Sequence, residues 1–325
     1  MNSRISGIGS YVPKRLLTNS DLAKIVDTND EWIVSRTGIK ERHICEKDEA
    51  SSDMASEAGK RAMESAGVKP EEIDFLITGT VTPDYRCPSA SCIIQEKLGL
   101  INAGTMDLVA ACAGFLHGLA TADAFIKIGK YKKIMVIGVE KLSSITDYTD
   151  RNTCVLFGDG AGAAIIEATE DGDGILATYL KSDGRFSKLL WIPNGGSAAP
   201  IQDLDDPKES IFLQMNGKEV YKHAVREMAD ASLRVLDEAG VKPEELKLLV
   251  AHQANIRIID GTAKRLKIPK DKVFLNIAKY GNTSAASVPI ALDEALQEGK
   301  IQKGDLVLMA AFGGGLTWAS TLIRW

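Results

Sequence analysis

Three residues that are far apart in the sequence, Cys112, His252 and Asn282, have the side-chain types that thioester chemistry needs. A thiolate can attack a thioester, while an imidazole and a carboxamide can donate hydrogen bonds to an oxygen on which negative charge develops. Each residue also has an ordinary explanation. Cys112 would then be a small buried hydrophobe, His252 a hydrogen-bonded core residue and Asn282 a turn residue.

The placement of Cys112 shifts the balance towards a nucleophile, whereas His252 and Asn282 taken alone leave the ordinary explanations open. Cys112 follows an apolar stretch and precedes a helical pattern that opens with small residues. A cysteine at a helix N-terminus lies near unpaired amides and the positive end of the helix dipole, which favour the thiolate. His252 ends an apolar run, and Asn282 lies in the loop 281–287 shortly before Pro289, which marks a first helical turn.

Composition excludes several classes of protein. The 325 residues are ample for one large domain or two fused halves, and 45% hydrophobic with 26% charged residues is ordinary for a globular protein. A net charge of −5 argues against a general nucleic-acid or membrane-surface role, so an acidic partner would need a local basic patch. The start of the chain lacks the apolar segment of a signal peptide, and no run approaches the roughly 18 apolar residues of a spanning helix. Five cysteines without metal-site spacing predict a reducing, cytoplasmic setting and no metal centre.

Short β-branched runs alternate with helical stretches, which is the pattern of an α/β protein. Because the runs are almost continuously apolar, we expect sheets that are covered on both faces. The predicted strands are residues 75–78, 105–109, 134–139, 162–167, 248–252, 272–276, 306–311 and 317–324.

The chain also repeats itself. Residues 66–73 recur as residues 239–246, residues 112–130 align without gaps against 282–300, and residues 157–160 resemble 312–315. The first match alone could arise by chance, but three matches in the same order predict two similar halves, residues 1–172 and 173–325. The alignment makes Cys112 and Asn282 equivalent, each after a strand and before a helix. Two halves packed around a pseudo-twofold axis would place both residues in one central cleft.

Four separated segments carry a specific resemblance: residues 110–114 (Ala-Ala-Cys-Ala-Gly), 252–255 (His-Gln-Ala-Asn), 281–287 (Gly-Asn-Thr-Ser-Ala-Ala-Ser) and 312–315 (Phe-Gly-Gly-Gly). With these the chain resembles the β-ketoacyl-acyl-carrier-protein synthase III family over essentially its whole length. The resemblance implies the internally duplicated, five-layered αβαβα thiolase fold. It also implies an acyltransferase that condenses an acyl-CoA primer with malonyl-acyl carrier protein, releasing CoA and CO₂. The product is 3-oxoacyl-acyl carrier protein, and the reaction initiates type II fatty acid biosynthesis.

The resemblance assigns roles at the reacting centre. Cys112 would become the acyl-cysteine, and the amides of Cys112 and Gly314 would form the oxyanion hole. His252 and Asn282 would stabilise the enolate left by decarboxylation. Asn282 distinguishes the chain from thiolases, which use a second cysteine there, and from elongating synthases, which use a second histidine. No cofactor is implied beyond the CoA thioester substrate.

The resemblance also assigns binding residues. Trp32 and Arg151 would sandwich the CoA adenine with Arg36 near its phosphates, although Trp32 in the core and solvated arginines remain the plain alternative. Further CoA contacts would come from Thr28, Phe157, Met215, Gly217, Ala254, Asn255 and Phe312. A basic patch for acyl carrier protein would comprise Lys222, Arg257, Lys264 and Arg265, the last three on one helical face.

Two further features bear on specificity. Cys87 occupies a position that in the family reaches across a homodimer interface to the acyl pocket, and its small side chain predicts acceptance of longer or branched primers. The glycine-rich segment 158–162 resembles a dinucleotide fingerprint but lacks the strand-turn-helix context, so we interpret it as tight backbone packing.

Other functions remain open from the sequence. The same residues could serve a specialised acyltransferase without decarboxylation, a Cys-His-Asn hydrolase, or a non-enzymatic acyl-binding module. Dependence on malonyl-acyl carrier protein and acylation of Cys112 distinguish these possibilities.

Overall fold

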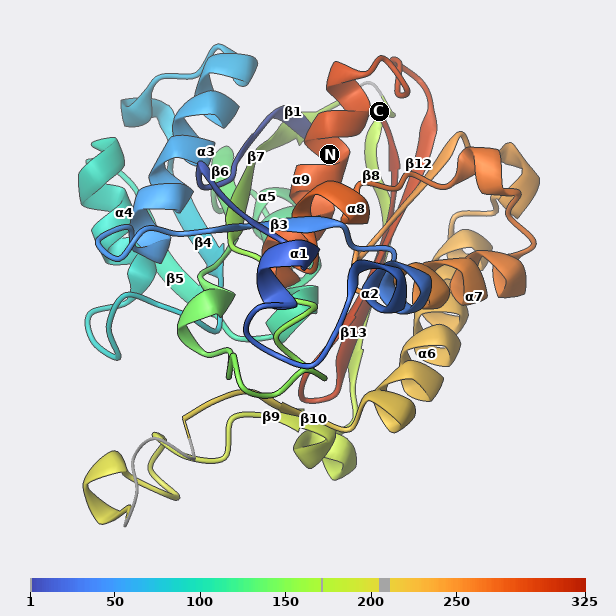
Figure 1. Cartoon of the computed structure of the whole chain (residues 1–325). Helices are drawn as coiled ribbons and strands as arrows, with labels where there is room; N and C mark the ends of the chain where they lie inside the picture. The colour runs from blue at the N-terminus through green and yellow to red at the C-terminus, as the bar shows by residue number, and fades with distance from the viewer. Residues whose placement is uncertain (1, 171, 205–210) are drawn as a thin grey trace.

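The computed structural model describes residues 2–170, 172–204 and 211–325, and two β-sheets form its centre (Figure 1). The first sheet has the order β1 (Asn2–Tyr11), β7 (Gly160–Thr169), β6 (Lys133–Glu140), β4 (Phe75–Gly79) and β5 (Gly104–Leu108). The second has the order β8 (Gly174–Ser182), β13 (Thr317–Arg324), β12 (Leu306–Gly313) and β11 (Leu248–Ala251).

The two sheets repeat one pattern of strand directions. In the first, β4 runs parallel to β5 and β6, whereas β7 is antiparallel to β6 and β1. In the second, β11 runs parallel to β12, whereas β13 is antiparallel to β12 and β8. The predicted duplication is therefore visible in the topology. The division into residues 1–172 and 173–325 stays an interpretation, and it falls between the end of β7 and the start of β8.

Helices complete five layers. The helices α5 (Gly114–Lys127) and α9 (Ser287–Gln297) lie between the sheets, and their apolar side chains share one core with strands of both sheets (Figure 1). The helices α3 (Ser51–Ala66) and α4 (Ala90–Leu98) cover the outer face of the first sheet. The helices α6 (Gly217–Glu238) and α7 (Ile256–Leu266) cover that of the second. The αβαβα arrangement is confirmed.

Smaller elements surround one end of these layers. The strands β2 (Arg15–Thr18) and β3 (Glu41–Ile44) pair with each other, and α1 (Asn19–Leu22) and α2 (Asp30–Thr37) lie between them in the sequence. A second short pair joins β9 (Leu190–Trp191) to β10 (Gln214–Met215). The helix α8 (Ile277–Tyr280) precedes the loop with Asn282. No helix within the described residues is long and apolar enough to cross a membrane.

Seven of the eight predicted strands are confirmed, and one is wrong. In segment 272–276 only Val273 makes a bridge, to Leu249. The Gln253 side chain explains the difference, because its amide donates to the Phe274 carbonyl and its carbonyl oxygen accepts the amides of Asn276 and Ile277. Backbone groups that a strand would use are thus bonded to a side chain. The prediction also missed β1 and β8, the corresponding strands of the two sheets.

Candidate active site

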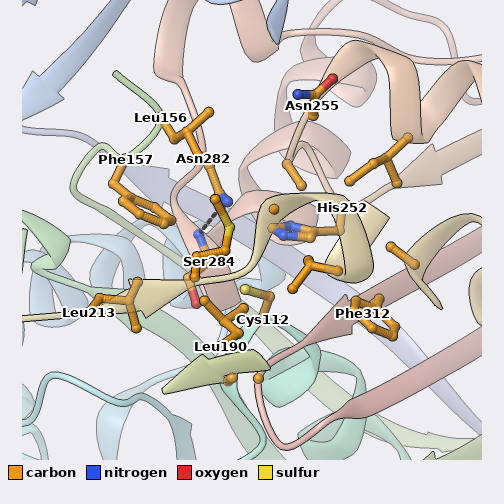
Figure 2. A pocket seen from close by; sticks show the side chains of 18 of the residues that line it. Cys112, Leu156, Phe157, Leu190, Leu213, His252, Asn255, Asn282, Ser284 and Phe312 are labelled. Atoms are coloured by element: carbon orange, nitrogen blue, oxygen red, sulfur yellow. Dashed lines mark hydrogen bonds between the residues drawn. The ribbon is translucent and has the colours of Figure 1, made fainter. Parts of the chain in front are cut away.

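A cavity of about 1170 Å³ brings the three predicted residues together. Cys112, His252 and Asn282 all lie on its wall, and Figure 2 shows them around one space. They reach it from three elements: the turn before α5, the end of β11 and the loop before α9. The expectation that both halves meet in one central cleft is therefore confirmed.

Cys112 lies in a 3₁₀ turn, Ala111–Ala113, directly before α5. Ala111 has a φ of +46°, which makes the chain turn sharply between β5 and the helix. The neighbouring strand end must be glycine here, because a Cβ on Gly313 would lie 2.5 Å from the backbone nitrogen of Cys112. The backbone of β12 therefore fixes the position of the nucleophile.

The thiolate expected for Cys112 is not its resting form. Burial and, to a smaller extent, the charge of Glu140 raise the pKa of the Cys112 thiol to about 12, although the neighbouring Ser284 side chain opposes the shift. The helix N-terminus is present as predicted, but the sulfur is almost fully buried, with 9% of the residue exposed. Desolvation of the charged form thus outweighs the helix effect, and Cys112 rests as a thiol.

The gapless alignment of the two halves is wrong at the site itself. The turn Ser284–Ala286 precedes α9 as Ala111–Ala113 precedes α5, and its first residue, Ser284, also has a positive φ of +50°. Turn by turn, Cys112 therefore corresponds to Ala285 rather than to Asn282. Asn282 instead lies after α8 and before the turn Ser284–Ala286. The helix α9 has 11 residues and α5 has 14, so a gapless alignment that matches the ends of the two helices cannot also match the turns at their starts.

His252 is held in one orientation as a neutral imidazole. Its backbone amide donates to the Ala310 carbonyl at 2.7 Å, and its Nδ1 lies 2.5 Å from Ser287 Oγ. Ser287 Oγ also accepts the backbone amide of Gln253 at 3.3 Å. Burial lowers the pKa of His252 to about 3, so the ring is uncharged at neutral pH. The Ser287 hydroxyl can then donate to Nδ1, which leaves the proton on Nε2.

Asn282 is oriented by its own loop. The backbone amide of Ser284 donates to Asn282 Oδ1 at 2.9 Å, the dashed line in Figure 2. The backbone of Asn282 is tied on both sides, through its amide to the Leu156 carbonyl and through its carbonyl to the amide of Gly158. Because Oδ1 is occupied by a donor, the Nδ2 amide is the group available to a ligand.

Most of the residues expected to bind CoA also line this cavity. They are Trp32, Arg36, Phe157, Met215, Gly217, Ala254, Asn255 and Phe312, and Gly314 lies on the same wall. The cavity thus extends from Cys112 to the indole of Trp32. Asn255 has a further function, because its side chain accepts the amide of Arg257 and caps α7.

Thr28, Arg151 and Cys87 are not among the lining residues. Arg151 nevertheless reaches the entrance, with its guanidinium carbon 5.3 Å from the centre of the Trp32 ring, while Arg36 lies at 4.8 Å. A ring stacked between two planes needs about 7 Å, twice the usual contact distance. An adenine can therefore enter only if Arg151 swings outward from its hydrogen bond with the Asp27 carbonyl. Thr28 Oγ1 is buried without a hydrogen-bond partner among the described residues.

The four residues of the expected basic patch are exposed, and three lie on α7 as predicted. Lys222 pairs with Glu219 at 2.6 Å, and Arg265 pairs with Asp230 at 3.0 Å. Arg257 donates to the Ser35 carbonyl and also borders the cavity entrance. The two ion pairs offset part of the positive charge, and no ion pair is found for Arg257 or Lys264 within the described residues.

Four side chains that hydrogen-bond in or next to the site were not singled out from the sequence: Ser284, Ser287, Gln253 and Glu140. The two serines lie in the recognised loop but had no role, and Gln253 follows His252 directly. Glu140 had a signal, since it is a charged residue at the carboxyl end of an apolar strand, where sites of α/β proteins gather. The interpretation of segment 158–162 is confirmed, because a Cβ on Gly158 would lie 2.5 Å from the Tyr280 carbonyl oxygen, and β7 begins within the segment, at Gly160.

Comparison with known proteins agrees with this geometry. The family model described as 3-oxoacyl-[acyl-carrier-protein] synthase III matches residues 106–184, and its C-terminal counterpart matches residues 236–325. A β-ketoacyl-[acyl-carrier-protein] synthase III of Caldanaerobacter subterraneus subsp. tengcongensis is 53% identical over 99% of this chain and 97% of its own. The Aquifex aeolicus enzyme of the same name is 51% identical over the full length of both chains.

Solved structures give the same result. The crystal structure of 3-oxoacyl-[acyl-carrier-protein] synthase III from Aquifex aeolicus superposes with a TM-score of 0.93 at 50% identity, covering 99% of this chain and all of the other. The enzyme from Pseudomonas aeruginosa superposes with a TM-score of 0.93 at 39% identity, covering 100% and 98%. Topology, site and sequence therefore agree: the chain has the thiolase fold and belongs to the β-ketoacyl-[acyl-carrier-protein] synthase III family.

Proposed function

We propose that this chain condenses an acyl-CoA primer with malonyl-acyl carrier protein, giving 3-oxoacyl-acyl carrier protein, CoA and CO₂, and so initiates type II fatty acid biosynthesis. The single observation that carries the proposal is the shared cavity, in which Cys112, His252 and Asn282 lie together. The same cavity reaches Trp32 and Arg36, a flat aromatic face and a cation suited to a nucleotide.

The first half-reaction acylates Cys112. The sulfur attacks the thioester carbonyl of acyl-CoA, and CoA leaves as the tetrahedral intermediate collapses. The amides of Cys112 and Gly314 would stabilise the oxyanion. Thr317 supports this arrangement, because its hydroxyl lies 2.8 Å from the Ala110 carbonyl and 3.0 Å from the Gly314 carbonyl. It thereby joins the two segments that supply the amides.

The second half-reaction makes the carbon–carbon bond. The thioester carbonyl of malonyl-acyl carrier protein accepts hydrogen bonds from His252 Nε2 and Asn282 Nδ2. As CO₂ leaves, the electron pair of the broken bond moves into the enolate, and these two neutral donors stabilise its oxygen. The enolate carbon then attacks the acyl group, and Cys112 leaves as a thiolate. Ser287 and the Ser284 amide, which fix the two donors, support these roles.

The binding assignments extend this proposal. The adenine would stack on Trp32 against Arg151, the phosphates would lie near Arg36, and acyl carrier protein would dock on the exposed cations of α6 and α7. Lys222, Arg257, Lys264 and Arg265 provide these cations, and opposite charge would steer the acidic carrier. The reaction requires thioester substrates only, so extensive dialysis against EDTA should leave its rate unchanged.

We propose that the protein is a homodimer in the cytoplasm. The strand β5 is an edge of the first sheet, and an edge strand is a template for pairing with another chain. Val109, which follows β5, is 78% exposed, and Ile101, which precedes β5 in the sequence, is also exposed. The five cysteines are free, as suits a reducing compartment. Cys87 is exposed and lies outside its own chain's cavity, so it could reach a partner's acyl pocket.

The test separates the half-reactions by intact-protein mass. Wild type, Cys112→Ala, His252→Ala and Asn282→Ala are mixed with acetyl-, isobutyryl- or octanoyl-CoA and then with malonyl-acyl carrier protein. We expect adducts on all but Cys112→Ala. Wild type should discharge them rapidly with release of CO₂, and the His252 and Asn282 variants should condense at least 100-fold more slowly, as is usual when a transition-state donor is lost.

Each alternative predicts a different result. Adducts on wild type that persist with malonyl-acyl carrier protein would indicate a specialised acyltransferase, and release of free acid would indicate a hydrolase. The absence of any adduct would contradict the assignment of Cys112. Strict preference for acetyl-CoA would contradict the wider primer range expected from Cys87, and Cys87→Phe should narrow whatever range is seen.

A further inference from the structure

A buried carboxyl group lies behind the nucleophile. Glu140 ends β6, is completely buried and receives several hydrogen bonds. Its Oε2 accepts Thr82 Oγ1 at 2.6 Å, Thr80 Oγ1 at 3.3 Å and the Val81 amide at 3.1 Å. Its Oε1 accepts Ser284 Oγ at 3.1 Å. A buried acid with neutral partners on every side costs free energy, so its retention calls for a reason.

Ser284 connects this carboxyl group to Cys112. The Ser284 hydroxyl donates to Glu140 Oε1 at 3.1 Å, Ser284 and Cys112 line the same cavity, and the two turns that carry them pack against each other. A hydroxyl group has one proton, so Ser284 cannot donate to both neighbours at the same time. With Glu140 ionised, Ser284 donates to the carboxylate and accepts the thiol proton. With Glu140 protonated, Ser284 donates to the thiolate.

We propose that Glu140 takes the proton of Cys112 through Ser284 and thereby generates the attacking thiolate. The S–H bond of Cys112 breaks as its proton passes to Ser284 Oγ, and the hydroxyl proton of Ser284 passes to Glu140 Oε1. The product is a thiolate that accepts a hydrogen bond from Ser284, beside a neutral carboxylic acid. Atoms and charge balance, and the negative charge moves from Glu140 to the sulfur. This inference rests on the proposed role of Cys112 as nucleophile.

The alternative base is His252, and its setting disfavours it. Its Nδ1 is already bonded to Ser287, and burial lowers its pKa to about 3. Burial raises the pKa of Glu140 to about 7, which makes this carboxylate the stronger base at neutral pH. The transfer also removes a conflict, because the Glu140 charge would otherwise oppose the thiolate. His252 remains free to act as a hydrogen-bond donor in the second half-reaction.

Other ionisable groups near β6 are engaged elsewhere. Lys141, next in the chain, donates to the carbonyls of Glu46 and Glu49. The elements that pack on β6 are β4, β7, α3, α5 and the turn with Ser284. Most of the ionisable residues on these elements and on β6 form ion pairs with other residues than Glu140: Asp53 with Lys97, Glu57 with Lys60, Asp123 with Lys127, Glu167 with Arg4, and Lys133 with Glu72. His117 and Arg61 bond to backbone carbonyls, and Glu64 is exposed to solvent.

The test measures the reactivity of Cys112 against pH. Alkylation by iodoacetamide is followed by mass spectrometry of the Cys112 peptide in wild type and Glu140→Gln. In wild type the rate should rise as Glu140 loses its proton near pH 7 and then level off. In Glu140→Gln that step should vanish, and the rate at pH 7.5 should fall about 100-fold, a usual contribution of a positioned base. Glu140→Asp should restore part of the step.

The sign of the effect decides the question. If Glu140 were only a buried negative charge opposing the thiolate, Glu140→Gln would react faster than wild type at pH 7.5. A rate equal to or above that of wild type therefore overturns the proposal. Ser284→Gly, which keeps Glu140 and suits the positive φ, should lose the same step, and its retention would also overturn the proposal. This variant serves too if Glu140→Gln does not fold.

Two controls separate this inference from other failures. Asp159→Asn removes another buried carboxyl group, which binds the Cys45 amide and Ser143, so it should lower the unfolding midpoint without removing the pH step. Acylation of wild type by acetyl-CoA reports on Cys112 itself. If wild type is acylated and Glu140→Gln is acylated equally fast, the relay fails while the proposed function stands. If wild type is not acylated, the proposed function fails first.

Discussion

At the scale of single residues, the site combines uncharged hydrogen-bond donors with one proton acceptor that lies out of substrate reach. His252 and Asn282 are each fixed by a serine of the same loop, the former through the Ser287 side chain and the latter through the Ser284 backbone. Neither donor needs to change its charge during decarboxylation. A site of this kind suits enolate stabilisation better than hydrolysis, which requires a base beside a bound water molecule.

The buried neutral state of His252 should make the protein sensitive to acid. Its pKa is lowered from 6.5 to about 3, so below pH 6.5 the unfolded chain binds a proton that the folded chain excludes. Stability should therefore fall as pH decreases from 6.5 towards 3. When the pH is lowered from 7.5 to 5.0, the free energy of unfolding should fall in wild type and fall by about 2 kcal/mol less in His252→Asn, which lacks the imidazole. Urea unfolding at both pH values measures this, with the half-exposed His223→Asn as control. Equal losses in all three proteins would show that His252 is not held neutral.

The sequence was sufficient to predict that Cys112, His252 and Asn282 meet in one cleft, because their types and the segments around them are local properties. It could not show that Cys112 rests as a thiol. That property depends on desolvation and on Glu140, which is close in space only after β6 and the turn with Ser284 have packed together. Glu140 was overlooked because a single acid after a strand is common, and only its burial distinguishes it.

At the scale of elements, closely packed backbones place the nucleophile. Gly79 ends β4, and a Cβ there would lie 2.8 Å from the carbonyl carbon of Gly114, the first residue of α5. Gly138 on β6 is similarly tight, with a Cβ 2.2 Å from the Ala285 carbonyl oxygen. Both turns at the site are thus pressed against the first sheet.

Gly79→Ala should therefore displace the start of α5 and, with it, Cys112. We expect a loss of about 1–3 kcal/mol in the free energy of unfolding, as is usual for overpacking, together with slower acylation of Cys112. Gly196→Ala is the matched control, since no atom lies within 4 Å of its Cβ and it should change stability by less than about 0.5 kcal/mol. Denaturant unfolding and acetyl-CoA mass labelling provide the measurements. If Cys112 of Gly79→Ala is acylated as fast as that of wild type, this contact does not position Cys112.

The same scale shows where sequence patterns are insufficient. The apolar runs of β4, β6 and β12 are buried on both faces and were predicted correctly. Segment 272–276 has a similar composition, yet the side chain of Gln253 takes its hydrogen bonds. The strand β1 was missed because polar residues interrupt it, and its pairing with β7 compensates. Periodicity cannot report a competing side chain or a distant partner strand.

At the scale of the whole molecule, the unpaired edge of β5 should be covered by a second copy. The chain mass is 35.0 kDa, and light scattering after size-exclusion chromatography should give twice that value. Val109→Lys places a charge beside the edge and should shift the mass towards that of one chain. Ile128→Lys is a matched control, because Ile128 is 74% exposed against 78% for Val109 but follows α5 at another site. A wild-type mass of one chain, or dissociation by both variants alike, would contradict pairing through this edge.

The burial of Cys112 also affects how well its thiol resists oxidation between turnovers. Oxidants react with thiolates much faster than with thiols, and the higher oxidation states of cysteine are irreversible. A nucleophile that stays protonated until its proton is removed internally is therefore a poor target for peroxide. The same desolvation that slows spontaneous ionisation of the sulfur protects the enzyme from inactivation, so its working lifetime and its chemistry depend on one buried environment.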